Sequence, residues 1–280
     1  MRKAYITFIL AIMYVPIALV IIYSFNESRL SSVWGGLSLS WYRELFRDRA
    51  MFSALVNSFV LATVSSLLAA VFGTLGAVGR VWDRPTDRPD SLQAKLINGR
   101  VGKVIEYLAI LPIMTPEIIM GMVLLAFFGF LGLPLGMLTL ILAHTCFCIP
   151  YVYLLVKARL AGLDRSLTEA ARNLGASPLR AFRDVMLPLL APAIISGVLL
   201  SFAMSFDDVI ISIFVTGPQI NTLPIRIYTQ LKTGVTPKTN ALCSLLFIIT
   251  ILLCILSAAV SRIRSSDNSV LLQDTGDLSV

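Results

Sequence analysis

Residues 166–192 read SLTEAARNLGASPLRAFRDVMLPLLAP, and this polar stretch lies between two long apolar segments. Ser166 and Glu169 have the S-x-x-E spacing of a capping box, which predicts that a helix begins here. An apolar face at helical spacing follows at Leu167, Ala170, Ala171 and Leu174. Gly175 is expected to end this helix, because glycine is favoured just after a helix C-terminus.

A second short helix is predicted to follow the first. Ser177 and Pro178 have the pattern of an N-cap followed by proline at the first helical position. The apolar face of this helix would be formed by Leu179, Phe182 and Val185 or Met186. We expect Pro188 and Pro192 to bend the chain where it enters the next apolar segment.

Two short helices joined at a glycine corner can serve two purposes. They can lie in the lipid headgroups, as amphipathic helices do, or their apolar face can fill a groove on a partner protein. A helix that only lies on a membrane needs neither a glycine corner nor a second capped helix. The sequence therefore favours docking onto a partner.

The rest of the chain has the composition of an integral membrane protein. Of its 280 residues, 57% are hydrophobic and 14% are charged, whereas a soluble domain contains about 25% charged residues. Runs of about 20 apolar residues predict membrane-spanning helices. Six are expected, near residues 5–24, 54–79, 107–129, 135–156, 190–216 and 241–260. The predicted fold class is all-α, a polytopic membrane protein with six transmembrane helices.

These spans are expected to form one membrane domain over residues 1–261, followed by a polar tail over 262–280. The first span follows a basic Met-Arg-Lys start and is too long for a signal-peptide h-region, so we interpret it as an uncleaved anchor. The segment 80–103 is polar and contains proline, which indicates an excursion outside the membrane.

The distribution of basic residues predicts the orientation. Sixteen lysines and arginines lie in the N-terminus, the 80–106 and 157–189 loops and the tail, against seven in the loops 25–53, 130–134 and 217–240. An excess of basic residues is typical of cytoplasmic loops, so both termini and the 157–189 loop are expected in the cytoplasm. This distribution also accounts for the net charge of +7 without a nucleic-acid partner.

Three acidic residues lie inside the predicted spans: Glu117, Asp207 and Asp208. An ionisable group at the bilayer centre costs about 2.5–3.5 kcal/mol on insertion scales, so such groups indicate function. The interiors of these spans contain no lysine or arginine. The acids therefore favour a cationic passenger.

Each of these residues also has an alternative interpretation. Glu117 follows a Thr-Pro pair and could lie in the first turn of a restarted helix, where an acid complements the helix dipole. Asp207 and Asp208 could lie in water at the outer end of a span, or pair with a basic residue of a second subunit. Adjacent helical residues point about 100° apart, so one of the two is expected to face a pathway. His144 is more typical of a packing residue than of a ligand.

The polar stretch resembles the EAA motif of ABC-transporter permeases, EAA-x3-G-x9-I-x-LP. The matching residues are Glu169, Ala170, Ala171, Gly175, Leu187 and Pro188. Val185 stands in the place of the isoleucine. The resemblance implies that the two short helices form a coupling-helix pair that docks into a cleft of a cytoplasmic ATPase.

The chain also resembles the polyamine permease subunits of spermidine/putrescine importers, within the binding-protein-dependent, MetI-like family. The segments that resemble them are YVPIALVIIYSFNESR, NSFVLATVSSLLAAVFGTLGA, LAHTCFCIPYV, SFDDVIISIFVTGP and LPIRIYTQLKTGVTPKTNAL. The resemblance implies a bacterial cytoplasmic (inner) membrane location. The implied partners are an ABC ATPase dimer, a second homologous permease subunit and a periplasmic polyamine-binding protein.

The same resemblance implies a substrate pathway that includes Glu117, Asp207 and Asp208. Carboxylates bind the ammonium groups of a polyamine, and aromatic faces attract them through cation–π contact. Trp41 is implied as such a contact, although an aromatic residue outside a span also commonly anchors the membrane interface.

The sequence contains no G-x-x-x-x-G-K-[ST] phosphate loop. The chain is therefore expected to hold no cofactor and to be no enzyme, with ATP and Mg²⁺ bound to the partner ATPase. Three alternatives remain open. The passenger could be another cation or small solute such as ferric iron, or the chain could be a self-contained secondary transporter. An intramembrane hydrolase is disfavoured, because neither H-E-x-x-H nor G-x-S-x-G occurs.

Overall fold

The computed structural model describes five stretches of the chain: residues 2–28, 33–81, 100–164, 166–234 and 236–252. They divide between two compact units, one formed by residues 1–49 and 229–280 and the other by residues 50–228. Within the described stretches the regular structure is helical, apart from one isolated antiparallel bridge between Asn26 and Leu37. The prediction of an all-α fold is confirmed.

The unit formed by the two chain ends contains α1 (Arg2–Tyr23), α2 (Ser40–Arg47) and an apolar helix over Pro237–Leu252. A half-buried cation ties α2 and its C-cap residue Asp48 to this last helix. The ammonium group of Lys238 lies 2.9 Å from Asp48 Oδ2 and 3.0 Å from Glu44 Oε1. The side chains of α1 from Tyr5 onward lie largely exposed within the unit, as expected for a helix that faces lipid or another protein.

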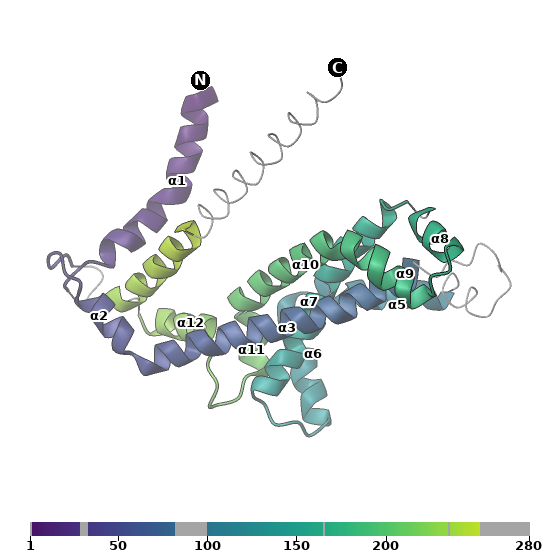
Figure 1. Cartoon of the computed structure of the whole chain (residues 1–280). Helices are drawn as coiled ribbons and strands as arrows, with labels where there is room; N and C mark the ends of the chain where they lie inside the picture. The colour runs from purple at the N-terminus through teal and green to yellow at the C-terminus, as the bar shows by residue number, and fades with distance from the viewer. Residues whose placement is uncertain (1, 29–32, 82–99, 165, 235, 253–280) are drawn as a thin grey trace, which may run out of the picture. The chain divides into compact units, whose positions relative to one another are not determined.

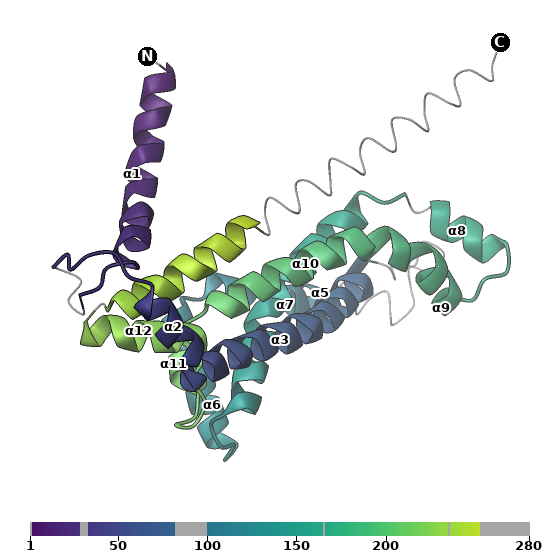
Figure 2. The same cartoon turned by 60° about the vertical axis from the view of Figure 1, so that its left-hand side comes forward.

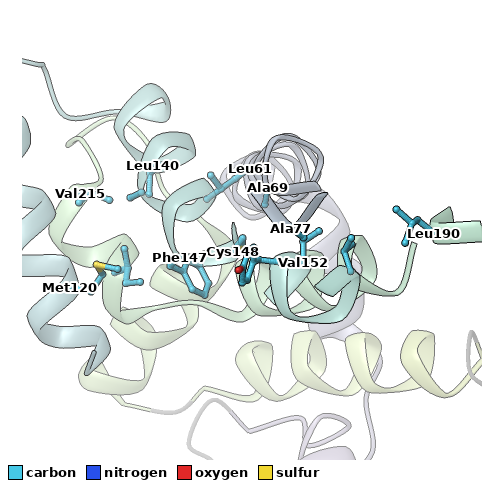
Figure 3. Close-up of a cluster of buried hydrophobic side chains, with 14 of the residues drawn as sticks. Leu61, Ala69, Ala77, Met120, Leu140, Phe147, Cys148, Val152, Leu190 and Val215 are labelled. Carbon is cyan, nitrogen blue, oxygen red and sulfur yellow. The ribbon is translucent and has the colours of Figure 1, made fainter. Parts of the chain in front are cut away.

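The unit of residues 50–228 is a helix bundle built around α7 (Met137–Ala161), which is buried on several faces. Alongside it lie α3 (Arg49–Val81), α5 (Arg100–Met114) and α10 (Leu187–Asp207), as Figures 1 and 2 show. Leu61, Ala69 and Ala77 of α3 share one apolar cluster with Phe147, Cys148 and Val152 of α7 (Figure 3).

Among the described residues, four helices are long and apolar enough to cross a membrane: Tyr5–Tyr23, Arg49–Gly79, Met137–Ala161 and Pro178–Asp207. The third predicted span, 107–129, is not one straight helix. It forms α5 and α6 (Glu117–Phe130), which meet at an angle of 116°. The cause is Pro116, which has the extended ψ of 132° and lacks an N–H, so the helix stops before it and restarts at Glu117.

The fifth predicted span, 190–216, is also interrupted. The helix α10 ends at Asp207, and Asp208 adopts an extended ψ of 128°. A short helix, α11 (Ile210–Val215), follows. A continuous helix over this range was therefore a wrong expectation, because apolar character alone does not reveal a side chain that competes for backbone N–H groups.

The two predicted short helices are α8 (Ser166–Asn173) and α9 (Pro178–Ala181). Ser166 is the first residue of α8 and not its cap. Asp164 instead accepts a hydrogen bond from the Ser166 N–H at 2.9 Å, which lowers the pKa of Asp164. Ser177 caps α9 as predicted, since its Oγ accepts from the Arg180 N–H at 3.4 Å.

The chain runs as one helix from Pro178 to Asp207 over 30 residues, and Figures 1 and 2 show it bending between α9 and the main part of α10. A π-helical turn, η1 (Phe182–Met186), joins α9 to α10. Pro188 has no N–H to offer the carbonyl four residues earlier, and the Leu187 N–H reaches back to the Phe182 carbonyl instead. The wider turn therefore accommodates the proline without ending the helix.

Several expectations fall partly or wholly outside the described residues. They concern most of the 80–103 segment, the end of the sixth span after residue 252, and the 262–280 tail.

Gly73 of α3 is expected to be essential for the packing of α3 on α7. A Cβ atom at this position would lie 2.9 Å from Val152 Cβ and 3.0 Å from the Ile149 carbonyl. Gly73→Ala should therefore lower the free energy of unfolding by about 1–3 kcal/mol, measured as a lower thermal midpoint of the purified complex in detergent.

Gly79 is a matched control, because a Cβ atom there meets nothing within 4 Å. Gly79→Ala should leave the midpoint unchanged or raise it, since alanine has the higher helix propensity. Equal midpoints for the two variants would show that the α3–α7 contact is not close-packed.

Candidate functional site

The break after α10 is formed by the side chain of Asp208. Its Oδ2 accepts hydrogen bonds from the Ser212 N–H at 2.8 Å and the Ser212 hydroxyl at 2.8 Å. Its Oδ1 accepts from the Ile211 N–H at 3.2 Å. The first N–H groups of a helix have no intrahelical partner, so Asp208 supplies the cap that α11 requires.

His144 of α7 joins the two sides of this break. Its Nδ1 lies 2.7 Å from the Ser205 hydroxyl in α10, and its Nε2 lies 2.9 Å from the Ser212 hydroxyl in α11. The same Nε2 is 3.4 Å from Asp208 Oδ2. The Ser205 hydroxyl is also 3.0 Å from that of Ser65 in α3. We call these five residues the His144 network.

The donor and the acceptor of each hydrogen bond in the His144 network can be assigned by starting at Asp208, whose carboxylate accepts. Because the Ser212 hydroxyl donates to Asp208, it can accept from a protonated His144 Nε2. His144 Nδ1 then accepts from the Ser205 hydroxyl. The Ser65 hydroxyl, which donates to the Leu61 carbonyl at 2.7 Å, lies 3.0 Å from that of Ser205. All five side chains are thus satisfied although they are buried, as polar groups inside a protein must be.

The other interrupted span lies beside this one, because α6 packs against α11. Gly121 of α6 leaves room for the Phe214 ring of α11, since a Cβ atom at Gly121 would be 2.5 Å from Phe214 Cδ2. Figures 1 and 2 show α6 and α11 together at one end of this unit and α8 and α9 at the other.

Glu117 lies in the first turn of α6, where its charge complements the helix dipole. Its side chain is exposed, and it is close enough to Tyr151 of α7 to interact with it electrostatically. The restarted helix was one of the two interpretations open from the sequence. The exposure of the carboxylate leaves it accessible to a passenger as well.

Asp207 and Asp208 are in opposite environments. The Asp208 side chain is 4% exposed and fully hydrogen-bonded, whereas Asp207 is exposed. No hydrogen bond or ion pair to the Asp207 carboxylate is present among the described residues. The two adjacent acids therefore differ in exposure, because α10 ends at Asp207 and Asp208 turns inward to cap α11.

Trp41 belongs to the other unit and is half-buried there. Its indole N–H donates to the Asn26 carbonyl at 2.7 Å, and the neighbouring Tyr42 hydroxyl lies 2.7 Å from that of Ser24. These bonds fix α2 against the segment that follows α1. The indole N–H is therefore committed to the fold, and the ring face remains the part that could meet a cation.

The EAA-like segment forms a corner whose apolar side chains are uncovered. Gly175 has φ +87°, a conformation that favours glycine. The Gly175 N–H donates to the Arg172 carbonyl and the Ala176 N–H to the Ala171 carbonyl, which is the Schellman end of a helix. Next to this corner, Leu174 and Leu179 are 89% and 76% exposed.

The remaining residues of this motif lie at the surface or near it. Glu169, Ala170, Leu187 and Pro188 are exposed, and Ala171 is half-buried. The motif thus combines a fixed backbone corner with side chains that no other described part of the chain covers, as a docking surface requires.

The sequence did not lead us to predict that serines of α10 form polar contacts with α7. Ser201 and Ser205 are four residues apart on α10 and both face α7, where Ser201 contacts Cys148. Such a pair of hydroxyls on one face of an apolar helix indicates a polar contact with a neighbouring helix, and His144 was the one histidine available as its partner.

Comparison with known proteins gives the family. The model of the family described as binding-protein-dependent transport system inner membrane components matches residues 91–265. The chain is 36% identical over 262 residues to the spermidine/putrescine transport system permease protein PotC of Haemophilus influenzae, covering 94% of this chain and 96% of that protein. It is 41% identical over 240 residues to the putrescine transport system permease protein PotI of Escherichia coli, covering 84% and 81%.

Solved structures share the fold. A bacterial ABC transporter that imports the acidic polysaccharide alginate matches with a TM-score of 0.67 at 15% identity, covering 93% of this chain and 94% of that chain. The inward-facing MetNI methionine ABC transporter matches with a TM-score of 0.55 at 19% identity, covering 77% and 97%.

The chain therefore belongs to the binding-protein-dependent family of transport system inner membrane components. It is a multi-pass membrane protein and a permease subunit, a transport component rather than an enzyme.

Ser205→Ala tests whether the His144 network stabilises the fold. The substitution removes the hydroxyl between Ser65 and His144 and should lower the free energy of unfolding by about 1–3 kcal/mol, because it leaves a buried partner unsatisfied. Thermal unfolding of the purified complex would show this as a lower midpoint.

The control is Ser196→Ala on the same helix. The Ser196 hydroxyl is exposed and bonds to the Pro192 carbonyl of its own helix, so its loss should leave the midpoint within experimental error. A Ser205→Ala midpoint equal to that of Ser196→Ala would contradict a stabilising role for the network.

Proposed function

We propose that this chain is the permease subunit of an ATP-driven ABC importer that moves polyamines, spermidine or putrescine, into the cytoplasm. The observation that carries this proposal is the 36–41% identity, over most of the chain, to permeases named for spermidine/putrescine and putrescine transport. The acids at the two helix breaks add independent support, because they favour a cation.

The charge of the helix breaks matches a cationic passenger. Breaks in membrane helices commonly expose helix N-termini, which attract anions. Here Glu117 occupies the first turn of α6 and Asp208 caps α11, so both N-termini already have a negative partner. Glu117 and Asp207 remain exposed. An anion would meet repulsion there, whereas an ammonium group would be attracted.

Within this proposal the pathway includes the residues expected from the sequence. Glu117, Asp207 and Asp208 provide the negative potential, and Trp41 offers its ring face. A flexible cation held by such dispersed groups is bound weakly enough to be released.

The proposed membrane arrangement has six transmembrane helices and both termini in the cytoplasm. The described helices provide α1, α3, the bent pair α5–α6, α7 and α10, and the helix beginning at Pro237 would begin the sixth span. The corner at Gly175 would face the cytoplasm of a bacterium, across the inner membrane from α6 and α11. The excess of basic residues in the 157–189 loop supports this orientation.

The coupling-helix pair, α8 with α9, would dock into a cleft of an ABC ATPase dimer. Exposed Leu174 and Leu179 supply the apolar contact that such a groove requires. ATP and Mg²⁺ would bind to that dimer, and a second homologous permease and a periplasmic polyamine-binding protein would complete the importer.

The helix Pro178–Asp207 suggests how a movement of the ATPase would be transmitted to the substrate pathway. It begins in the docking region and ends at the break next to Asp207. At 1.5 Å per residue, its 30 residues span about 45 Å. Closure of the ATPase dimer would displace the docking end of this helix, and the end next to Asp207 would move with it. This motion would switch the bundle between inward- and outward-facing states.

An uptake experiment tests the substrate. Cells that lack the gene should lose uptake of labelled spermidine, labelled putrescine or both, and restoring the gene should recover it. Persistence of both uptakes in the deletion strain would redirect the proposal to another cation such as ferric iron. Uptake that collapses with an uncoupler while ATP is maintained would favour a self-contained secondary transporter.

Gly175→Val tests the coupling role. A β-branched residue is strained at φ +87°, so the corner should deform and uptake should fall by about tenfold or more, while the protein remains inserted in the membrane. The measurement is uptake per amount of complex, together with ATP hydrolysis by that complex.

Gly175→Asn provides the matched control, because asparagine tolerates positive φ better than other non-glycine residues. It should retain most of the uptake. If Gly175→Val transported as well as Gly175→Asn, the corner would have no part in coupling.

A further inference from the structure

The two adjacent acids at the break differ in what remains available to a ligand. Asp208 already accepts three hydrogen bonds, from the Ser212 N–H, the Ser212 hydroxyl and the Ile211 N–H, and His144 Nε2 lies 3.4 Å from its Oδ2. A carboxylate offers about four acceptor positions. With its side chain 4% exposed and most of its acceptor positions occupied, Asp208 lacks the access that an incoming ammonium group needs.

Asp207 has both. Its carboxylate is exposed, and it ends α10. The last carbonyls of a helix lack intrahelical partners and form the negative end of the helix dipole. An acid at this end is electrostatically unfavourable for the helix itself, so the fold does not explain Asp207. The carboxylate and the helix end together produce a negative potential that favours a cation.

The His144 network prevents the break from moving. Its members belong to four helices or their junctions: Ser65 in α3, His144 in α7, Ser205 in α10 and Ser212 in α11. His144 bonds to a residue before the break and to one after it. A shift of the break along the chain would therefore leave several buried polar groups without partners, which is strongly unfavourable.

We propose that the His144 network is a positioning device, in which Asp208 is held as the cap of α11 and Asp207 alone of the pair contacts the passenger. Asp208 is then a positioning residue, and Asp207 is the residue that binds an ammonium group. The passenger in this statement rests on the proposed function, whereas the position of Asp208 does not.

The test compares isosteric and truncating variants in the complete transporter. Asp207→Asn removes the charge and should raise the KM for spermidine uptake by about 10- to 100-fold, the factor expected for one charge-assisted hydrogen bond, with no change in thermal midpoint. Asp208→Asn keeps one of the two acceptor oxygens and places an amide NH2 group where the other accepted, so the midpoint should fall somewhat while KM stays within about twofold. Asp207→Glu restores the charge and should recover most of the lost affinity.

Asp208→Ala removes the cap and supplies the measurement that does not depend on the substrate. It should lower the thermal midpoint of the complex by about 2 °C or more, and by more than Asp208→Asn does. Asp207→Ala is the matched control at the adjacent position and should leave the midpoint unchanged or raise it slightly, because the Asp207 carboxylate has no partner in the described structure and opposes the helix dipole.

Two results would overturn the proposal. One is a KM for Asp208→Asn that rises as much as that for Asp207→Asn. The other is an Asp208→Ala complex that unfolds at the temperature of the original protein. If the original protein takes up neither polyamine, the proposed substrate is wrong, and the thermal midpoints alone decide. Equal midpoints for the Ala variants at 207 and 208 then reject the role of Asp208, and a selective fall for Asp208→Ala supports it.

Discussion

The hydrogen bonds from the start of α11 to the Asp208 carboxylate are the constraint on which the rest of the site depends. A helix that breaks inside an apolar bundle leaves backbone N–H groups with no water to receive them, and each such group is costly. Asp208 receives the N–H groups of Ile211 and Ser212, and His144 holds the Ser212 hydroxyl from the neighbouring helix. The break is stabilised because the protein itself supplies these partners.

Once the break is fixed, the positions of its neighbours follow. The helix α10 must end at Asp207, and α11 turns to pack on α6, where Gly121 admits the Phe214 ring. The helix α6 is itself a restarted segment, because Pro116 ends α5. Two interrupted spans thus lie together and bring exposed acids to the ends of otherwise apolar helices. At the opposite end of the same unit, the corner at Gly175 leaves apolar side chains uncovered (Figure 2).

The docking corner could be predicted from the sequence because its signals are local. Gly175, Ser177 and Pro178 are read by backbone rules that act within one turn, and the structure confirms each of them. The capping prediction failed at Ser166. This residue is the first of α8, and the Asp164 carboxylate accepts the hydrogen bond from its N–H. The backbone rules also gave no sign of the π-helical turn Phe182–Met186, which joins α9 to α10 just before Pro188.

The break at Asp208 could not be predicted in the same way. Its partners are distant in the sequence: His144 is 61 residues from Ser205 and 68 from Ser212, and no local pattern shows that they meet. The acids themselves were found, because an ionisable residue in an apolar run is conspicuous. Which of them is buried was decided by tertiary contacts alone.

The most direct test of this account is an experimental structure of the complete transporter with spermidine bound in the membrane domain. The account predicts that an ammonium group of the passenger lies within hydrogen-bonding distance of the Asp207 carboxylate. Asp208 should still accept hydrogen bonds from Ser212 in that structure. An Asp208 side chain that has left the His144 network to contact the passenger would contradict the account.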